Sequence, residues 1–257
     1  MNIRTFQSIY EELQLTQSKV QKKFQIKAGN LGDFARLNVS SLNRIIRPAL
    51  VIMTSRMFNN HSDKVIFLAA VIQYIYLASY VHRRINEDFP DGEKPDPRDD
   101  SQFPILVGDY LFGRFFATLC DGGLVQYLHP LAEIIRLINE GGILNKQNPD
   151  ARTVNLKTFQ EIIRLETAEL FAGSCRLGAH LAGAGEEQCK NMHYFGLSLG
   201  MAVGFLEEGV EGGLANKYLD QANGNLAALA ETAQIGELEG VINLFRQREE
   251  FMHRLVG

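Results

Sequence analysis

The chain has 257 residues, of which 46% are hydrophobic, and a formal net charge of −4 from 26 Lys+Arg and 30 Asp+Glu. This apolar content predicts a sizeable core and excludes a disordered chain, and the mildly acidic balance gives no electrostatic footprint for nucleic acid. Three cysteines without a CxxC pair predict neither a disulfide framework nor a structural zinc site, and they suit a reduced, cytoplasmic compartment. The N-terminal segment has no apolar stretch with a cleavage site, so no signal peptide is expected.

Apolar residues recur at helical spacing between turn-rich stretches along the whole chain. They predict a first helix over 2–25, a second over 40–59 capped by Ser40 or Ser41, and a third over 62–87 capped by Ser62. The apolar run from Val65 to Tyr80 is shorter than the roughly 20 residues of a membrane span, so it predicts a buried core helix.

Prolines and dense charge over 88–101 predict a solvated loop after the third helix. The helical pattern then resumes over these ranges: 103–120, 124–146, 156–183, 186–211, and 214–256 as two pieces broken near Gly236. No strand alternation persists, and no stretch reads as a linker. The sequence therefore predicts an all-α, single-domain bundle over residues 1–257, with no transmembrane segment.

Four segments carry a resemblance to a known family, in that family's order. They are NRIIRP (43–48), QYIYLASYVHRRINE (73–87), VGDYLFGR (107–114) and FGLSLGMAVGFLEEGVE (195–211). The first two resemble G-K-R-L-R-P and E-L-I-H-x-A-S-L-L-H-D-D-x-x-D of the trans-polyprenyl diphosphate synthases, and the others resemble A-G-D-Y-L-L-A-R and Y-G-x-x-L-G-x-A-F-Q-I-x-D-D-x-x-D. Residues 162–184 are similar to a helix that carries Lys-Thr in that family. The resemblance implies an isoprenoid-synthase-type bundle, here with a shortened C-terminal part.

The resemblance also implies a chemistry that this chain is poorly equipped to perform alone. In the family, two aspartate-rich motifs on facing helices hold Mg²⁺ against an allylic diphosphate. The first motif is degenerate here, since its positions are occupied by Arg83, Arg84 and Glu87. A guanidinium group repels a divalent cation. The second motif keeps its negative charge and spacing in Glu207, Glu208 and Glu211, which could still bind Mg²⁺; no other cofactor is implied.

Other positions differ from the family as well. Arg44 and Arg47 stand where the resemblance implies a diphosphate-binding pair, whereas Lys-Thr becomes Glu166-Thr167 and the glutamine before the second motif becomes Gly204. Arg83 and Arg84 have three open interpretations: plain surface charges, a diphosphate pocket, or an ion pair with Glu207 or Glu208 across the cleft.

Three further groups of residues complete the expectations. Ala78 and Ser79 stand where the resemblance implies control of product chain length, although they are equally consistent with close helix packing. The subunit interface implied by the resemblance comprises Gly108, Asp109, Tyr110, Leu111 and Phe115. His82 is predicted to be a core histidine, Cys120 and Cys175 are predicted to be buried and inert, and no residue is assigned a catalytic role.

The resemblance supports three functional interpretations. The first is a non-catalytic or regulatory subunit of a heteromeric trans-polyprenyl diphosphate synthase in isoprenoid (quinone side chain) biosynthesis, similar to the small component of heptaprenyl or hexaprenyl diphosphate synthase. Its partner would be a catalytic prenyl synthase subunit, with a homodimer and an isoprenoid diphosphate ligand as further expectations. The second is a divergent prenyltransferase that uses the glutamate motif alone. The third is an isoprenoid- or lipid-binding protein without chemistry.

Overall fold

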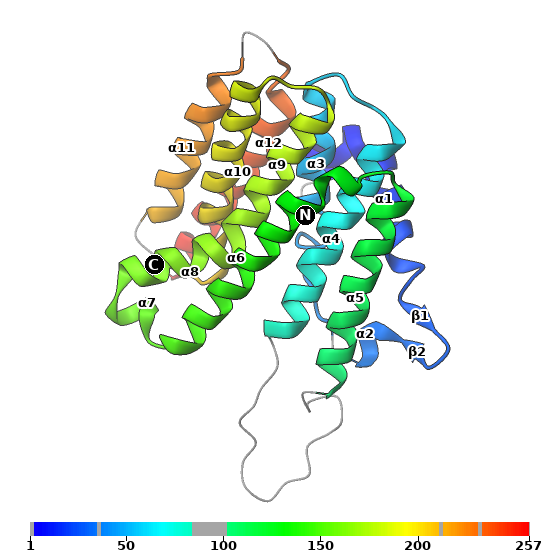
Figure 1. The fold of residues 1–257 in the computed structure, drawn as a ribbon. Coiled ribbons are helices and arrows are strands. Elements are labelled where there is room, and N and C mark those ends of the chain that lie inside the picture. Colours follow the sequence, from blue (N-terminus) through cyan, green and yellow to red (C-terminus); the bar gives the residue numbers. More distant parts are fainter. Residues whose placement is uncertain (1–2, 35–36, 84–101, 211–212, 231–232, 257) are drawn as a thin grey trace, which may run out of the picture.

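The computed structural model describes residues 3–34, 37–83, 102–210, 213–230 and 233–256 as a bundle of helices (Figure 1). The N-terminal elements are η1 (Ile3–Ile9), α1 (Tyr10–Gln21), β1 (Gln25–Ile26), β2 (Gly29–Asn30), α2 (Leu31–Phe34), α3 (Ile46–Met57), α4 (Asp63–Arg83) and α5 (Gln102–Asp121). The rest are η2 (Val125–Tyr127), α6 (Leu128–Gln147), α7 (Ala151–Val154), α8 (Leu156–Ile163), η3 (Arg164–Ala168), α9 (Glu169–Leu181), α10 (Glu186–Glu207), α11 (Leu214–Ala227) and α12 (Gly236–Val256). The predicted all-α class is confirmed.

Three local features differ from the sequence prediction. A two-stranded antiparallel hairpin, β1–β2, follows α1, although no strand was expected. The second helix begins at Ile46 rather than at residue 40, because Pro48 is tolerated only in the first turn of a helix. Ser40 instead accepts a hydrogen bond from the Asn43 amide in the preceding turn, at 3.2 Å. The expected helix over 156–183 is interrupted by η3, a π-helical turn.

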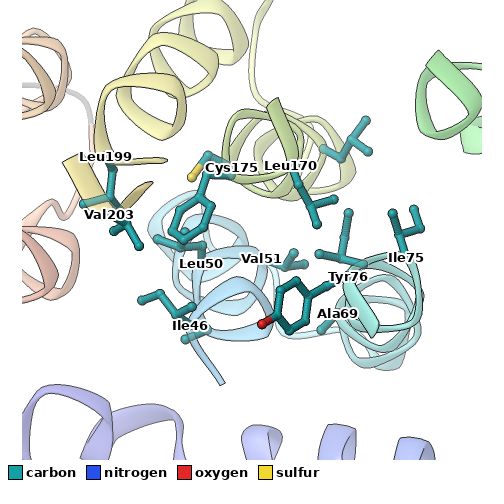
Figure 2. Close-up of a cluster of buried hydrophobic side chains, with 14 of the residues drawn as sticks. Ile46, Leu50, Val51, Ala69, Ile75, Tyr76, Leu170, Cys175, Leu199 and Val203 are labelled. Carbon is teal, nitrogen blue, oxygen red and sulfur yellow. The ribbon is translucent and has the colours of Figure 1, made fainter. Parts of the chain in front are cut away.

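The core forms where α3, α4, α9 and α10 meet. Figure 2 shows side chains from these four helices converging, among them Leu50 of α3, Ala69 of α4, Leu170 of α9 and Leu199 of α10. Almost every residue of α3 is buried, and the polar residues Arg47, Thr54 and Ser55 are buried along with the apolar ones. Contacts with α4 and α9 on its sides therefore place α3 at the centre of the bundle.

Small residues allow α10 to approach η3 and α9 closely. A Cβ at Gly200 would lie 2.6 Å from the Ala168 Cα, and one at Gly204 would lie 2.4 Å from the Ile163 Cγ2. Real Cβ atoms do not come this close, so a glutamine at residue 204 would force this wall of the bundle apart. Packing between α10 and α8–η3 thus accounts for the glycine at that position.

Helices α4 and α5 lie side by side (Figure 1). Both are long and apolar enough to cross a membrane by length and composition alone, but 78% of the relevant window in α4 is buried inside the chain, against 39% in α5. A core helix passes the same test, and the burial of α4 confirms that it is the predicted core helix. One cysteine prediction is wrong: Cys175 is buried, whereas Cys120 lies on the exposed side of α5.

Candidate functional site

A cleft of about 760 Å³ opens between the ends of α4 and α10 and the wall formed by α6, α7, α8 and η3. Its volume falls in the usual range for small-molecule sites, roughly 300–1,000 Å³. Its apolar lining includes Tyr76, Ile138, Phe159 and Ile163. The C-terminal ends of α4 and α10, which carry the two predicted motifs, both reach this cleft.

Arg83, the first position of the degenerate motif, forms an ion pair inside the cleft. Its NH1 group lies 3.4 Å from Oε2 of Glu166 on η3, and the Glu166 side chain is only 13% exposed. Asn145 of α6 donates a hydrogen bond to the same carboxylate oxygen, at 3.5 Å. An ion pair with Glu207 or Glu208 was one of the three interpretations of Arg83, and it is corrected here: the π-helical turn presents Glu166 to the end of α4 instead.

Glu207 at the end of α10 is bound across the cleft by a different residue. Asn43 Nδ2 donates to Glu207 Oε1 at 2.7 Å, linking positions 164 residues apart in sequence. Glu208 also lines the cleft and is exposed. Arg84, Glu87 and Glu211 lie outside the described residues.

The described carboxylates do not by themselves make up a complete magnesium site. Glu166 and Glu207 are both engaged by N–H donors of the chain itself, and no group of three or more His, Cys, Asp or Glu side chains converges among the described residues. Hard divalent cations need several oxygen ligands around one point. The proposed glutamate ligands, with Glu211 outside the description, therefore stay a prediction.

The two candidate diphosphate-binding arginines lie in different places. Arg47 lines the cleft and is only 2% exposed, with its guanidinium 3.8 Å from the centre of the Tyr76 ring. Burial lowers the pKa of Arg47, while Tyr76 and Glu207 oppose that shift. Its NH1 group donates to Asn43 Oδ1 at 3.4 Å, and its Nε has no partner among the described residues. A buried cation with so few hydrogen bonds is a good candidate for binding an anion.

Arg44 is not brought to this cleft. Its Nε donates to the Val39 carbonyl at 3.0 Å, and its side chain lines two smaller cavities beside α1. The structure thus separates the two arginines that the sequence grouped together.

The two candidate chain-length positions also differ. Ser79 lines the cleft, and its buried hydroxyl has no partner among the described residues. Ala78 is fully buried in α4 and does not line the cleft. Of this pair, only Ser79 is placed to contact a ligand.

The candidate interface residues on α5 divide between two faces. Gly108, Leu111 and Phe115 are buried within the chain, so they cannot themselves form a partner surface while this packing holds. Asp109 is exposed, and the Tyr110 hydroxyl donates to the Lys23 carbonyl at 2.9 Å. The outward apolar residues of the same helix are Ile105, Leu106 and Phe116, at 42%, 64% and 52% exposure.

Sequence reasoning missed several residues of the cleft. Asn43 was quoted only as part of a motif, Asn145 and Lys146 lie at the end of the helix predicted over 124–146, and Arg152 lies between two predicted helices. Arg152 donates to the Gly209 carbonyl at 3.2 Å, which ties α7 to the end of α10. No periodicity marks these residues, because each reaches the cleft from a helix end or a loop.

Comparison with known proteins finds prenyl diphosphate synthases among the sequence relatives of this chain. A family model described as Polyprenyl synthetase matches residues 99–204. Heptaprenyl diphosphate synthase component 2 of Geobacillus stearothermophilus is 28% identical over 196 residues, 75% of this chain and 61% of that protein. Octaprenyl diphosphate synthase of Escherichia coli K12 is 24% identical over 174 residues, 66% of this chain and 54% of that protein. The chain thus matches less than two thirds of the length of these curated relatives.

Solved structures share the fold. A polyprenyl synthase from Caulobacter crescentus CB15, complexed with calcium and isoprenyl diphosphate, superposes with a TM-score of 0.76 at 20% identity, over 94% of this chain and 97% of that one. A heterotetrameric geranyl pyrophosphate synthase from mint gives 0.70 at 17% identity, over 90% and 96%. At these identities the likeness concerns the fold alone. The chain therefore resembles the polyprenyl synthetase family in sequence and has the fold of solved polyprenyl synthases, as its motifs predicted.

Proposed function

We propose that this chain is a non-catalytic or regulatory subunit of a heteromeric trans-polyprenyl diphosphate synthase, acting in the cytoplasm in isoprenoid (quinone side chain) biosynthesis. One observation carries the proposal: Arg83 stands where the family motif has a metal-binding aspartate, and it pairs with Glu166. A positive group at this point opposes the cation that would assist diphosphate departure. The cleft is retained, but at this position its arginine is paired with a carboxylate of the cleft wall.

The apolar face of α5 supports a partner. Ile105, Leu106 and Phe116 are exposed on α5, and Val125 and Leu128 are exposed on the following segment. Several large apolar side chains left exposed on one helix and the segment after it are consistent with an interaction surface. The name of the Geobacillus relative, a "component 2", and the heterotetrameric mint enzyme are consistent with a multi-subunit assembly. The partner in this proposal is a catalytic prenyl synthase that carries both aspartate motifs.

The subunit would contribute the shape of its own cleft. Ser79, Ile138 and Phe159 line a cavity large enough for an isoprenoid chain. In the proposed assembly this cavity and the partner contact influence product length, while the partner performs the chemistry.

The test is to purify the chain alone and together with a full-length prenyl synthase encoded beside it. We expect a stable complex by size-exclusion chromatography, no prenyl transfer by the chain alone, and a product length that changes when the chain joins the complex. A homodimer that performs robust Mg²⁺-dependent prenyl transfer from farnesyl and isopentenyl diphosphates would refute the proposal.

A second function, a divergent prenyltransferase, is favoured by one observation. Glu207 and Glu208 both line the cleft at the end of α10. If these carboxylates bind Mg²⁺, activity of the isolated chain should depend on both of them. Loss of Mg²⁺-dependent turnover in Glu207→Gln and Glu208→Gln would establish this alternative, whereas tight binding of a long prenyl chain without turnover or partner would indicate a lipid-binding protein.

A further inference from the structure

The Glu166 carboxylate is held firmly in the wall of the cleft. It accepts a hydrogen bond from Asn145 at 3.5 Å, and the Glu166 side chain is 13% exposed, against 29% for Arg83. Gly141 of α6 packs against it so closely that a Cβ there would lie 2.9 Å from the Glu166 Cγ. Glu166 is therefore the fixed member of the ion pair, and Arg83 is the member with access to the cleft.

The charged residues of the cleft leave a small positive excess. Among the described lining residues, four are arginines or lysines and three are glutamates: Arg47, Arg83, Lys146, Arg152, Glu166, Glu207 and Glu208. Glu207 is engaged by Asn43, and Glu166 is engaged by Arg83. Neutralising Glu166 would raise the net charge of these seven lining residues from +1 to +2. It would also leave Arg83 without its carboxylate partner.

We infer that Glu166 is an internal counter-anion for Arg83, and that a diphosphate group binds in this cleft without metal by replacing that carboxylate as the partner of the Arg83 guanidinium. A guanidinium binds phosphate oxygens with the same N–H donors that it offers to a carboxylate, so the two anions compete for Arg83. Because the pair is partly buried, salt screens their competition less than it screens an exposed pair. The inference rests on the proposed function only in placing a diphosphate in this cleft, and it adds that Glu166 keeps the affinity low.

The test is isothermal titration of inorganic pyrophosphate into the purified full-length chain, in EDTA and again with Mg²⁺. We expect weak, metal-independent binding by the wild type and about fivefold tighter binding by Glu166→Gln, which corresponds to the upper range for a partly exposed ion pair. Glutamine keeps the size of the side chain and can still accept the hydrogen bond from Asn145. Unchanged or weaker binding by Glu166→Gln, or wild-type binding that requires Mg²⁺, would overturn the inference.

A matched control separates local competition from net charge. Glu133→Gln removes the same charge from an exposed α6 residue that pairs with Arg136 at 3.0 Å and does not line the cleft. It should leave pyrophosphate affinity unchanged, and equal tightening in both variants would contradict a specific role for Glu166. Adding Arg83→Gln to Glu166→Gln should abolish the gain, which a double-mutant cycle measures.

A second titration, with farnesyl diphosphate, identifies the source of the ligand group. Equal tightening for both probes in Glu166→Gln supports recognition of the diphosphate alone, and a larger gain with farnesyl diphosphate than with pyrophosphate supports a prenyl diphosphate as the ligand. These titrations use the isolated chain and record no turnover. The counter-anion inference and the proposed subunit role can therefore fail independently.

Discussion

Gly108 of α5 lies directly against the His82 ring of α4. A Cβ at residue 108 would come within 1.9 Å of His82 Nε2, so the ring occupies the space that any larger residue would need. We expect Gly108→Ala to lower the free energy of unfolding by about 1–3 kcal/mol, the usual cost of overpacking. The alanine would also push the His82 ring away from the Ile105 carbonyl and the Asp109 carboxylate, at 3.4 and 3.6 Å. Urea unfolding measures the loss.

Gly113 on the same helix provides the control. Nothing lies within 4 Å of a Cβ built there. Gly113→Ala should therefore be neutral or should stabilise the chain by up to about 1 kcal/mol, since alanine favours helix more than glycine does. Equal destabilisation by both alanine variants would show that the contact with His82 is not what requires glycine at residue 108.

The Asn43–Glu207 hydrogen bond gives a direct test of metal competence. Asn43→Asp would place a carboxylate 2.7 Å from Glu207 Oε1 in place of a donor, with Glu208 also on the cleft. Like charges this close repel, although Arg47 NH1 at 3.4 Å from this position offsets part of the cost, and a divalent cation bound between the two carboxylates should raise stability. We expect the melting temperature of Asn43→Asp, but not of the wild type, to rise with added Mg²⁺.

Asn43→Ala serves as the matched control because it removes the hydrogen bond to Glu207, together with the one from Arg47 at 3.4 Å, without adding charge. It should lose about 1–3 kcal/mol and show no response to Mg²⁺. A wild-type melting temperature that rises with Mg²⁺ would contradict this prediction and would favour the divergent prenyltransferase.

The sequence predicted the fold well because the helices are long and strongly patterned. The apolar run from Val65 to Tyr80 sufficed to identify the core helix α4, and the whole-chain spacing excluded a large sheet. The β1–β2 hairpin was missed because each strand has only two residues, too short for alternation to be visible. The late start of α3 could have been inferred from Pro48, because a proline is tolerated only in the first turn of a helix.

The site was less predictable because its contacts join distant segments. Motif comparison correctly brought Arg83 and Glu207 to one cleft, since both end helices that face it. It could not identify Glu166 as the partner of Arg83, because that contact depends on the π-helical turn η3. Nor could it indicate that Asn43 would bind Glu207, since no sequence pattern shows that two residues 164 positions apart are in contact.

Arg56 of α3 anchors the N-terminal helices to the bundle. Its NH1 group donates to the Ser8 carbonyl at 2.7 Å, and its NH2 group donates to Glu12 Oε1 at 2.5 Å. Arg56→Met keeps the apolar stem but removes these donors. We expect a loss of about 1.5–3 kcal/mol in urea unfolding, the range for hydrogen bonds to charged groups, and only partial rescue by Arg56→Lys, which lacks the planar fork.

Arg136, an exposed arginine, provides the control for Arg56. Arg136 on α6 bonds Glu133 and Glu140 at 3.0 and 2.7 Å, all on one helix surface. Arg136→Met should therefore leave the free energy of unfolding almost unchanged, because exposed ion pairs contribute little to stability. If both methionine variants lose the same stability, the link between α3 and the N-terminal segment contributes nothing beyond a surface ion pair.

The three cysteines should differ sharply in reactivity, because only the thiolate attacks a disulfide reagent. Burial raises the pKa of Cys175 to about 12, and burial also raises the pKa of Cys189. Cys120 is exposed on α5.

At pH 8 we expect one fast-reacting thiol per isolated chain with Ellman's reagent, and this reaction should be lost in Cys120→Ser. In guanidinium chloride all three thiols should react. A second fast thiol in the folded wild type, or a fast phase that survives Cys120→Ser, would contradict the packing of α9 and α10 around the buried pair. In the proposed heteromer the same reagent reports on the α5 surface, since a partner seated there should slow the reaction of Cys120 while leaving the other two unchanged.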